Sequence, residues 1–223
     1  MEKGDFLKIF ADTADLDELK ELNLWGVIDG CTTNPKIIAV QKVDFESRMK
    51  EILKLVSGPV SIEVTSNNLD EMIQEGKKFS AWGKNAVIKL PMTVNGLKAL
   101  QVLKQEKIKT NVTACMSVNQ AVLAAKAGAT YVSLFYSRIG DLGYDARIVI
   151  QDTVKVFDRW NYSSEIIVGS IRHLMQVQDA MLAGVDIVTI PFNYIKQMTQ
   201  NPQTDATLDE FLRFWNEYKG NKK

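Results

Sequence analysis

Short apolar, β-branched segments alternate with longer amphipathic segments along almost the whole chain, and no other feature of the sequence restricts the fold as strongly. The apolar segments predict eight strands, at residues 6–12, 26–34, 59–65, 86–91, 109–114, 130–136, 165–171 and 186–192. The amphipathic segments predict one helix after each strand, at residues 15–24, 44–56, 69–82, 96–106, 117–127, 146–160, 174–183 and 194–200. Parallel neighbouring strands require crossover connections of this kind. We therefore predict an α/β protein in which eight strands close into a (β/α)8 TIM barrel.

An open, doubly wound sheet is the competing fold for such a pattern. The count of eight strands and the lack of a glycine-rich dinucleotide-binding motif both favour the barrel. The chain has 223 residues, fewer than the roughly 250 that are typical of this barrel. Since no linker, low-complexity segment or charge run divides it, we predict a single domain over residues 1–223.

One further helix is predicted after Pro202. The residues Leu208, Phe211, Leu212 and Trp215 follow the spacing i, i+3, i+4 and i+7, which gives the segment 206–218 one apolar face. Such a helix can pack on its own barrel or on a neighbouring subunit, and the sequence leaves both possibilities open.

The composition excludes several classes of protein. With 27 Lys plus Arg against 27 Asp plus Glu, the formal net charge is zero, which argues against a nucleic acid or an acidic membrane surface as the partner. No stretch approaches the roughly 18 apolar residues of a membrane span, and the first twelve residues lack the apolar core of a signal peptide. Cys31 and Cys115 cannot form a disulfide framework, and the single histidine, His173, excludes a His-rich metal site. We expect a cytoplasmic protein in which both cysteines are small core residues and His173 starts a helix.

Polar residues gather at the carboxyl ends of the predicted strands, although a buried strand should be almost entirely apolar. In a (β/α)8 barrel, this end carries the active site. A single Ser or Thr there can be an ordinary buried hydrogen-bond partner, but the same bias in seven strands indicates a functional site. The residues are Asp12, Thr32, Thr33, Asn34, Glu63, Lys89, Asn111, Thr113, Ser133, Ser170 and Arg172.

Lys89 is the central candidate. It lies between Ile88 and Leu90 in a predicted strand, where an ammonium group is expensive to bury. Burial favours the neutral amine, which is the form that attacks a carbonyl carbon and makes a Schiff base. The alternative is a structural ion pair with Asp12 or Glu63, although an ion pair in a core seldom stabilises it more than apolar residues would.

Asp12 and Glu63 end the first and third predicted strands, so both should face the same mouth of the barrel. A carboxylate beside an imine can accept a proton from a hydroxyl group, and a second carboxylate can manage water and protons. The sequence leaves open whether Glu63 does this or only positions Lys89.

Ser170 and Arg172 follow the seventh predicted strand, where barrels of this type often bind phosphate. Arg138, after the sixth strand, can supply a second guanidinium group for the same anion. An arginine on a loop is by itself usually a solvated surface residue. Two arginines and one serine at adjacent strand ends predict a phosphate site.

Six segments match motifs of a known family: ADTADLDEL (11–19), GCTTNP (30–35), IKLPMT (88–93), KTNVTA (109–114), AKAGATYVS (125–133) and SIRH (170–173). With these motifs in order between about Phe6 and Trp215, the chain resembles the transaldolases. It is most similar to the short subfamily that also contains the fructose-6-phosphate aldolases.

The resemblance implies an enzyme that acts on sugar phosphates through a lysine Schiff base, without a metal or another cofactor. Lys89 falls on the Schiff-base lysine, and Asp12 on the aspartate that acts on the substrate hydroxyl. The positions that hold the dihydroxyacetone part or the catalytic water are matched by Thr32, Asn34, Asn111, Thr113 and Ser133, and those that bind phosphate by Arg138, Ser170 and Arg172. The resemblance also implies a ring-like homo-oligomer, a pentamer or decamer, in which the C-terminal helix reaches a neighbour.

Two positions separate the branches of this subfamily. Transaldolases have Glu at the position of Glu63 and Phe at that of Phe135, whereas the aldolases have Gln and a Tyr whose hydroxyl helps to protonate the bound carbanion. Phe135 cannot donate that proton, so the resemblance favours dihydroxyacetone transfer between sugar phosphates, a reaction of the pentose phosphate pathway. A fructose-6-phosphate aldolase is the alternative, and a catalytically weak relative that binds sugar phosphates is the third possibility.

The chain departs from the family pattern at several positions beside the mouth. Leu134, Tyr136 and Ser137 stand where Pro, Val and Gly are usual, and Leu174 stands where Pro is usual. These departures bear on the preferred acceptor. Alternation along a strand would turn Tyr136 outward, so we do not expect it to replace the missing phenol.

Overall fold

The computed structural model describes residues 6–220, which form eight strands and eleven helices. The strands are β1 (Lys8–Asp12), β2 (Gly30–Thr32), β3 (Val60–Glu63), β4 (Ala86–Pro91), β5 (Thr110–Cys115), β6 (Tyr131–Phe135), β7 (Glu165–Gly169) and β8 (Ile187–Ile190). The helices are α1 (Leu16–Trp25), α2 (Pro35–Gln41), α3 (Phe45–Leu55), α4 (Leu69–Ser80), α5 (Val94–Gln105), α6 (Val118–Ala127), α7 (Tyr136–Asp141), α8 (Ala146–Arg159), α9 (Leu174–Leu182), α10 (Phe192–Met198) and α11 (Pro202–Gly220).

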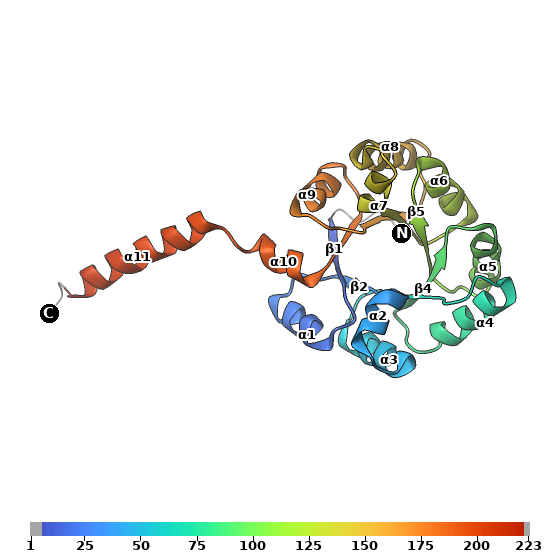
Figure 1. Ribbon diagram of the computed structural model, residues 1–223, viewed down its shortest axis with the longest axis horizontal. Coiled ribbons are helices and arrows are strands. Elements are labelled where there is room, and N and C mark those ends of the chain that lie inside the picture. The colour runs from blue at the N-terminus through green and yellow to red at the C-terminus, as the bar shows by residue number, and fades with distance from the viewer. Residues whose placement is uncertain (1–5, 221–223) are drawn as a thin grey trace. The chain divides into compact units, whose positions relative to one another are not determined.

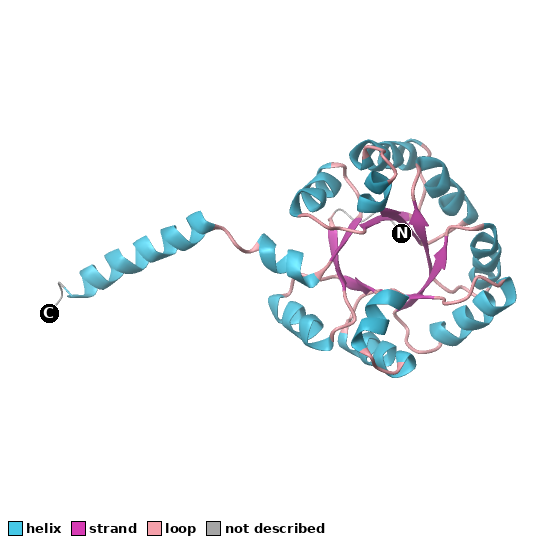
Figure 2. Cartoon of the chain, viewed as in Figure 1, coloured by secondary structure: helices cyan, strands magenta, loops and turns pink. Residues whose placement is uncertain are grey.

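The strands close into a barrel. Each strand pairs in parallel with the next one along the chain, and β8 pairs with β1. Figures 1 and 2 show the ring of strands surrounded by helices α1 to α9. The predicted (β/α)8 barrel is confirmed, and the open doubly wound sheet is excluded because an open sheet has two edge strands, whereas here the ring of strands is closed.

The described chain falls into two compact units. The first contains the whole barrel and extends to Phe192, and the second begins at Asn193. The second unit consists of most of α10 and the long helix α11, whose described residues include none that is buried. Among residues 6–220, no helix has both the length and the apolar composition that crossing a membrane requires.

Most helices begin at a polar residue whose side chain accepts hydrogen bonds from the first free amides of the helix. Each such cap stabilises its helix by about 1 kcal/mol. The capping residues are Asp15, Asn34, Asp44, Asn68, Thr93, Ser117, Asp145 and His173. His173 therefore starts a helix, as predicted, and its Nδ1 accepts a hydrogen bond from the Met175 amide.

The second predicted strand was too long at both ends. Gly26 caps the end of α1 in the left-handed conformation, with φ of 68°, and Asn34 caps the start of α2. Only Gly30–Thr32 therefore remains for β2. The prediction also missed α2, because Pro35 looks like the end of a strand and is in fact the first residue of a helix, where its missing N–H costs nothing.

The sixth predicted strand was also too long, because Tyr136 belongs to a second helix that the prediction missed, α7. This helix has only six residues and lacks the apolar periodicity of a longer one. Its first amides lie close to the end of β7, and the Ser137 N–H donates to the carbonyl of Ser170.

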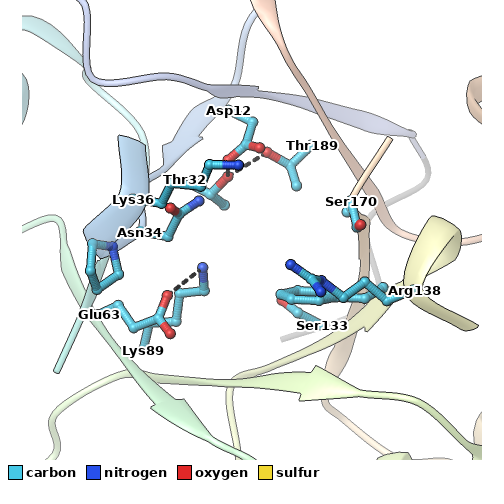
Figure 3. Close-up of a pocket in the computed structure, with 13 residues that line it drawn as sticks. Asp12, Thr32, Asn34, Lys36, Glu63, Lys89, Ser133, Arg138, Ser170 and Thr189 are labelled. Carbon is cyan, nitrogen blue, oxygen red and sulfur yellow. Dashed lines mark hydrogen bonds and ion pairs between the residues drawn. The ribbon is translucent and has the colours of Figure 1, made fainter. Parts of the chain in front are cut away.

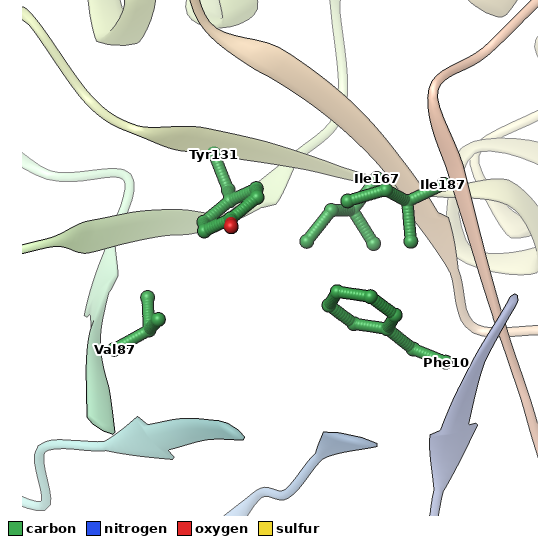
Figure 4. Close-up of a cluster of buried hydrophobic side chains, with 5 residues drawn as sticks. All are labelled: Phe10, Val87, Tyr131, Ile167 and Ile187. Atoms are coloured by element: carbon green, nitrogen blue, oxygen red, sulfur yellow. The ribbon is translucent and has the colours of Figure 1, made fainter. Parts of the chain in front are cut away.

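An apolar layer fills the interior of the barrel. Phe10, Val87, Tyr131, Ile167 and Ile187 come from five strands and meet at the barrel axis (Figure 4). The rings of Phe10 and Tyr131 pack edge to face with their centres 6.5 Å apart. A Cβ at Gly30 would lie 2.7 Å from the Phe10 ring, so this position of β2 requires glycine.

Candidate active site

A cavity of about 290 Å³ opens at the carboxyl ends of the strands (Figure 3). It is lined by Asp12, Thr32, Asn34, Pro35, Lys36, Glu63, Lys89, Ser133, Phe135, Arg138, Gly169, Ser170 and Thr189. The apolar layer forms its floor, because every member of that layer lies two residues before a lining residue on the same strand. Alternate residues of a strand face the same side, so Phe10 precedes Asp12 and Val87 precedes Lys89 in the barrel interior.

Lys89 lies in the barrel interior, and its amine has two hydrogen-bond partners. Its side chain is 5% exposed, and Nζ lies 2.9 Å from Oε2 of Glu63. A second hydrogen bond of 3.0 Å runs from Nζ to the backbone carbonyl of Thr33. The parallel register places Glu63 directly beside Lys89 on the neighbouring strand, which sets up the ion pair. Of the two carboxylates that the sequence offered as partners for Lys89, the structure selects Glu63.

Asp12 stands at the end of β1 and faces the same cavity. The Thr32 hydroxyl, from the register partner on β2, lies 2.9 Å from Oδ1 of Asp12. The same hydroxyl lies 2.6 Å from that of Thr189 on β8. Burial within the barrel raises the pKa of Asp12, and the nearby charge of Lys89 and the hydrogen bond from Thr32 oppose part of this effect.

Asn34 connects the cavity with helix α2. Its side-chain oxygen accepts a hydrogen bond of 3.0 Å from the Ile37 amide at the start of this helix. The oxygen is therefore used by the cap, and the NH2 group of the same side chain is a donor available at the cavity wall.

Asn111 does not line the cavity but supports a residue that does. It is fully buried, accepts a hydrogen bond of 2.7 Å from Ser133, and donates one of 3.1 Å to Ser61. Thr113, two residues further along β5, is also buried, and its hydroxyl makes no hydrogen bond to any residue that the structure describes. The next residue, Ala114, adopts a left-handed φ of 60° where the pairing of β5 with β6 shifts register.

The predicted phosphate residues separate into two groups. Arg138 on α7 and Ser170 after β7 both line the cavity. Arg172 is not among the described residues that line it, and its guanidinium group makes two hydrogen bonds of 3.0 Å to the carboxylate of Asp141. Of the two arginines that the sequence predicted for one anion, Arg138 lines the cavity and Arg172 is paired with Asp141.

Two of the positions that depart from the family pattern, Tyr136 and Ser137, connect α7 with α9. The Tyr136 hydroxyl donates a hydrogen bond of 2.7 Å to Asp179, and the Ser137 hydroxyl donates one of 3.0 Å to Gln176. The pKa of Tyr136 is raised by burial and by this bond to Asp179. Tyr136 is thus bonded outside the described lining, and it begins a helix, so the expected alternation along a strand does not apply to it. Phe135, the residue before it, lines the cavity.

The sequence missed two polar lining residues, Lys36 and Thr189. Thr189 is a polar residue in the eighth strand and thus follows the same bias as the other candidates, so the signal for it was present. Lys36 was missed together with helix α2, to which it belongs. Cys31 and Cys115 are buried and unpaired, as predicted for core residues, and burial raises the pKa of both thiols.

Fold and site together define a (β/α)8 barrel with a buried lysine at the base of a polar, cation-lined cavity. Residues 9–221 match the family described as Transaldolase/Fructose-6-phosphate aldolase. A protein of Oceanobacillus iheyensis named "Probable transaldolase" is 46% identical over 96% of this chain and all of its own length. A protein of Shouchella clausii with the same name is 48% identical over 94% of this chain and 97% of its own. The chain belongs to the transaldolase/fructose-6-phosphate aldolase family of enzymes.

Replacing Asp12 with Asn should change how stability depends on pH. A carboxyl whose pKa is raised on folding binds its proton more tightly in the folded state, so the wild-type protein loses stability as the pH rises from the ordinary pKa of 3.8 through the raised value. Asn stays neutral, so the free energy of unfolding of Asp12→Asn should increase relative to wild type over this range. Urea unfolding at a series of pH values measures the difference.

The control for this experiment is Asp209→Asn, which changes an exposed carboxyl on α11. Its difference from wild type should stay nearly constant with pH. A constant difference for Asp12→Asn as well would contradict the expected pKa shift.

Proposed function

We propose that this protein is a transaldolase that moves a dihydroxyacetone unit from a ketose phosphate to an aldose phosphate. The amine of Lys89 adds to the C2 carbonyl of sedoheptulose 7-phosphate or fructose 6-phosphate and, with loss of water, forms an imine. Asp12 then takes the proton of the C4 hydroxyl, the C3–C4 bond breaks, and an aldose phosphate leaves. The remaining enamine attacks the aldehyde carbon of a second aldose phosphate, and hydrolysis of the new imine releases the product.

The environment of Lys89 is the observation that carries this proposal. A neutral amine has two N–H groups and one lone pair. Glu63, 2.9 Å from Nζ, can take the extra proton of the ammonium form, and the carbonyl of Thr33 at 3.0 Å holds the nitrogen in place, so that the lone pair can then attack a carbonyl carbon. The cavity above the amine brings the substrate to this atom.

The other candidate residues fit roles around this imine. Asp12 is held by Thr32 at the cavity wall, and burial raises the pKa of its carboxyl, as a group that accepts and returns a proton requires. The NH2 group of Asn34 and the hydroxyl of Ser133 can bind hydroxyls of the dihydroxyacetone part. Asn111 holds Ser133 in place, and the buried hydroxyl of Thr113 suits a bound water.

The contact between Glu63 and Lys89 supports both roles that the sequence left open for this carboxylate. In the resting site Glu63 positions the amine. After imine formation the nitrogen no longer has two protons to donate, so the carboxylate can turn to the water that enters or leaves at C2. Both roles use the same oxygen at different steps.

Phe135 favours transfer over release. An enamine that is protonated on carbon is lost as free dihydroxyacetone, whereas one that stays unprotonated survives until an aldehyde arrives. Phe135 lines the cavity and carries no proton to donate, and the nearest tyrosine in sequence, Tyr136, is bonded to Asp179 outside the described lining. Release by a fructose-6-phosphate aldolase is the second candidate, because the matched family includes that activity by name.

Further features of the proposal follow from the same mechanism. The imine acts as the electron sink, so we propose that the reaction needs no metal and no organic cofactor, and that activity survives treatment with EDTA. Dihydroxyacetone transfer between sugar phosphates places the enzyme in the pentose phosphate pathway, and we propose the cytoplasm as its location.

Sodium borohydride should trap the proposed imine on Lys89. With fructose 6-phosphate present, reduction of the imine should give a secondary amine and add the mass of the reduced sugar to the peptide that contains Lys89. Peptide mass spectrometry locates the adduct. The variant Lys89→Met should give no adduct, whereas Lys84→Gln, which changes an exposed lysine before the same strand, should be trapped like wild type. If folded wild-type protein gives no adduct on Lys89, the proposed imine is contradicted.

Transfer and release are separated by a second measurement. Formation of glyceraldehyde 3-phosphate from fructose 6-phosphate should be slow alone and should rise by at least about tenfold when erythrose 4-phosphate is added as acceptor, because the enamine then has a partner. The variant Phe135→Tyr should raise the acceptor-independent rate. Fast cleavage by wild type without an acceptor would favour the aldolase, and turnover with neither substrate set would favour a catalytically weak relative.

We also propose that the protein is a ring-shaped homo-oligomer, a pentamer or decamer, in which α11 packs on a neighbouring subunit. Helix α11 carries large apolar side chains that are each about half exposed, among them Phe211 at 63% and Trp215 at 52%. The predicted apolar face is present on this helix, and such a row of exposed aromatic side chains is typical of a protein interface.

Changing this face should break the oligomer. Phe211→Glu combined with Trp215→Glu should lower the mass measured by light scattering during size-exclusion chromatography, because each change buries a charge in the proposed interface. Glu210→Gln, on the opposite face of α11, is the control and should leave the mass unchanged. A double variant that keeps the wild-type mass would contradict the interface.

A further inference from the structure

Thr189 on β8 lines the cavity but has no part in the mechanism proposed above. Its side chain is almost fully buried, and its hydroxyl lies 2.6 Å from that of Thr32. Thr32 in turn donates a hydrogen bond of 2.9 Å to Oδ1 of Asp12. Figure 3 shows these three side chains next to one another at one wall of the cavity. Three strands, β8, β2 and β1, therefore contribute to one chain of hydrogen bonds that ends on Asp12.

The direction of this chain follows from the number of protons. A threonine hydroxyl has one proton to donate and two lone pairs that accept, whereas an ionised carboxylate only accepts. Because Thr32 donates its proton to Asp12, its contact with Thr189 needs the proton of Thr189. Thr189 is thus the first donor of the chain, and its donation polarises Thr32 and strengthens the bond to the carboxylate.

The barrel fixes the position of Thr189. The register of β8 with β1 places it beside Phe10, and it lies two residues after Ile187 of the apolar layer, so its side chain faces the interior. On the other neighbouring strand, β7, a Cβ at Gly169 would lie 3.0 Å from the methyl carbon Cγ2 of Thr189. Glycine at this position leaves room for the methyl group, while the hydroxyl is bonded to Thr32.

The chain of hydrogen bonds uses only one oxygen of Asp12. The other oxygen, Oδ2, makes no hydrogen bond with any residue among 6–220. Since Asp12 lines the cavity, Oδ2 is the oxygen available to a hydroxyl group of a bound substrate. The titratable side chains near this carboxyl are Lys89, Glu63, Cys31 and Lys36, and none of them is hydrogen-bonded to either threonine hydroxyl.

We propose that Thr189 is a positioning residue, which donates its proton to Thr32 and thereby holds Oδ1 of Asp12 and keeps Oδ2 turned to the cavity. When the C3–C4 bond breaks, Oδ2 takes the proton of the C4 hydroxyl. It returns this proton to the new hydroxyl when the enamine adds to the second aldehyde. This proton step rests on the proposed function, whereas the chain of hydrogen bonds does not.

Kinetics of Thr189→Val test this role, because valine has nearly the shape of threonine and lacks the hydroxyl. For transfer from fructose 6-phosphate to erythrose 4-phosphate, kcat should fall by about tenfold with little change in KM, since a hydrogen bond that orients the base is lost. Thr189→Ser keeps the hydroxyl and should retain most of the activity. The control Thr153→Val removes a buried hydroxyl of α8 that is bonded to the Val149 carbonyl, and should behave like wild type.

Borohydride trapping separates this role from imine formation. Thr189→Val should still be trapped on Lys89, because the two partners of that amine do not include Thr189. With fructose 6-phosphate present, a larger share of the adduct than in wild type should carry all six carbons of the sugar. The reason is that cleavage of the C3–C4 bond is slowed, whereas formation of the imine is not.

Unfolding measurements give a readout that needs no activity. The chain favours the ionised form of Asp12, because its last bond is to a charge. Thr189→Val should therefore raise the pKa of Asp12 further, and the loss in the free energy of unfolding that it causes should grow as the pH rises through this pKa. In the Asp12→Asn background the same change should cost the same at every pH. Urea unfolding of the four proteins measures this difference.

The outcomes separate this inference from the proposed function. Wild-type protein without an imine on Lys89 overturns the proposed function, and a cost of Thr189→Val that depends on pH only when Asp12 is present still supports the inference. An active wild type whose kcat is unchanged by Thr189→Val, or a cost that does not depend on Asp12, overturns the inference alone. The inference also fails if Thr189→Val raises KM and leaves kcat unchanged, because Thr189 then contacts the substrate, or if Thr189→Ser or Thr153→Val is equally impaired.

Discussion

The ion pair between Lys89 and Glu63 is the interaction on which the arrangement of this site depends. A charged amine inside a barrel is costly unless acceptors surround it, and here the two acceptors come from strand β3 and from the turn after β2. The pairing of β3 with β4 places Glu63 beside Lys89. A slip of β4 by one residue would turn Lys89 toward the surrounding helices and break its contact with Glu63. The ion pair therefore also favours the observed register of β3 and β4.

The alternation of side chains along the strands positions both the cavity residues and the apolar layer below them. On five strands, an apolar residue of the interior layer is followed two residues later by a residue that lines the cavity. The polar groups therefore stand on a packed floor that excludes water from below, which is why the hydrogen bonds of Asp12 and Lys89 lie in surroundings of low polarity. Gly30 leaves room for this floor, because a side chain there would collide with the Phe10 ring.

Sequence reasoning predicted the parts of the structure that repeat. Eight strands and the helices between them are encoded by many residues each, and the bias of polar residues toward the strand ends located Asp12, Lys89 and Ser133. Helices α2 and α7 have seven and six residues, so they carry no periodic signal. The contact of Arg172 with Asp141 could not be predicted, because Asp141 is the last residue of α7, a helix that the sequence did not show, 31 positions earlier in the chain.

The groups around Lys89 and the two exposed cations of the cavity lining are held in different ways. Around Lys89 the groups come from strands and are held by short bonds in a buried setting, so a change of one side chain leaves a buried polar group without a partner. By contrast, Arg138 and Lys36 are exposed and are carried by two short helices. Helix α7 is held by polar contacts to α9, through Tyr136 with Asp179 and Ser137 with Gln176. Because these contacts lie apart from those of Lys89, we expect substitutions in them to move Arg138 and to leave the amine in place.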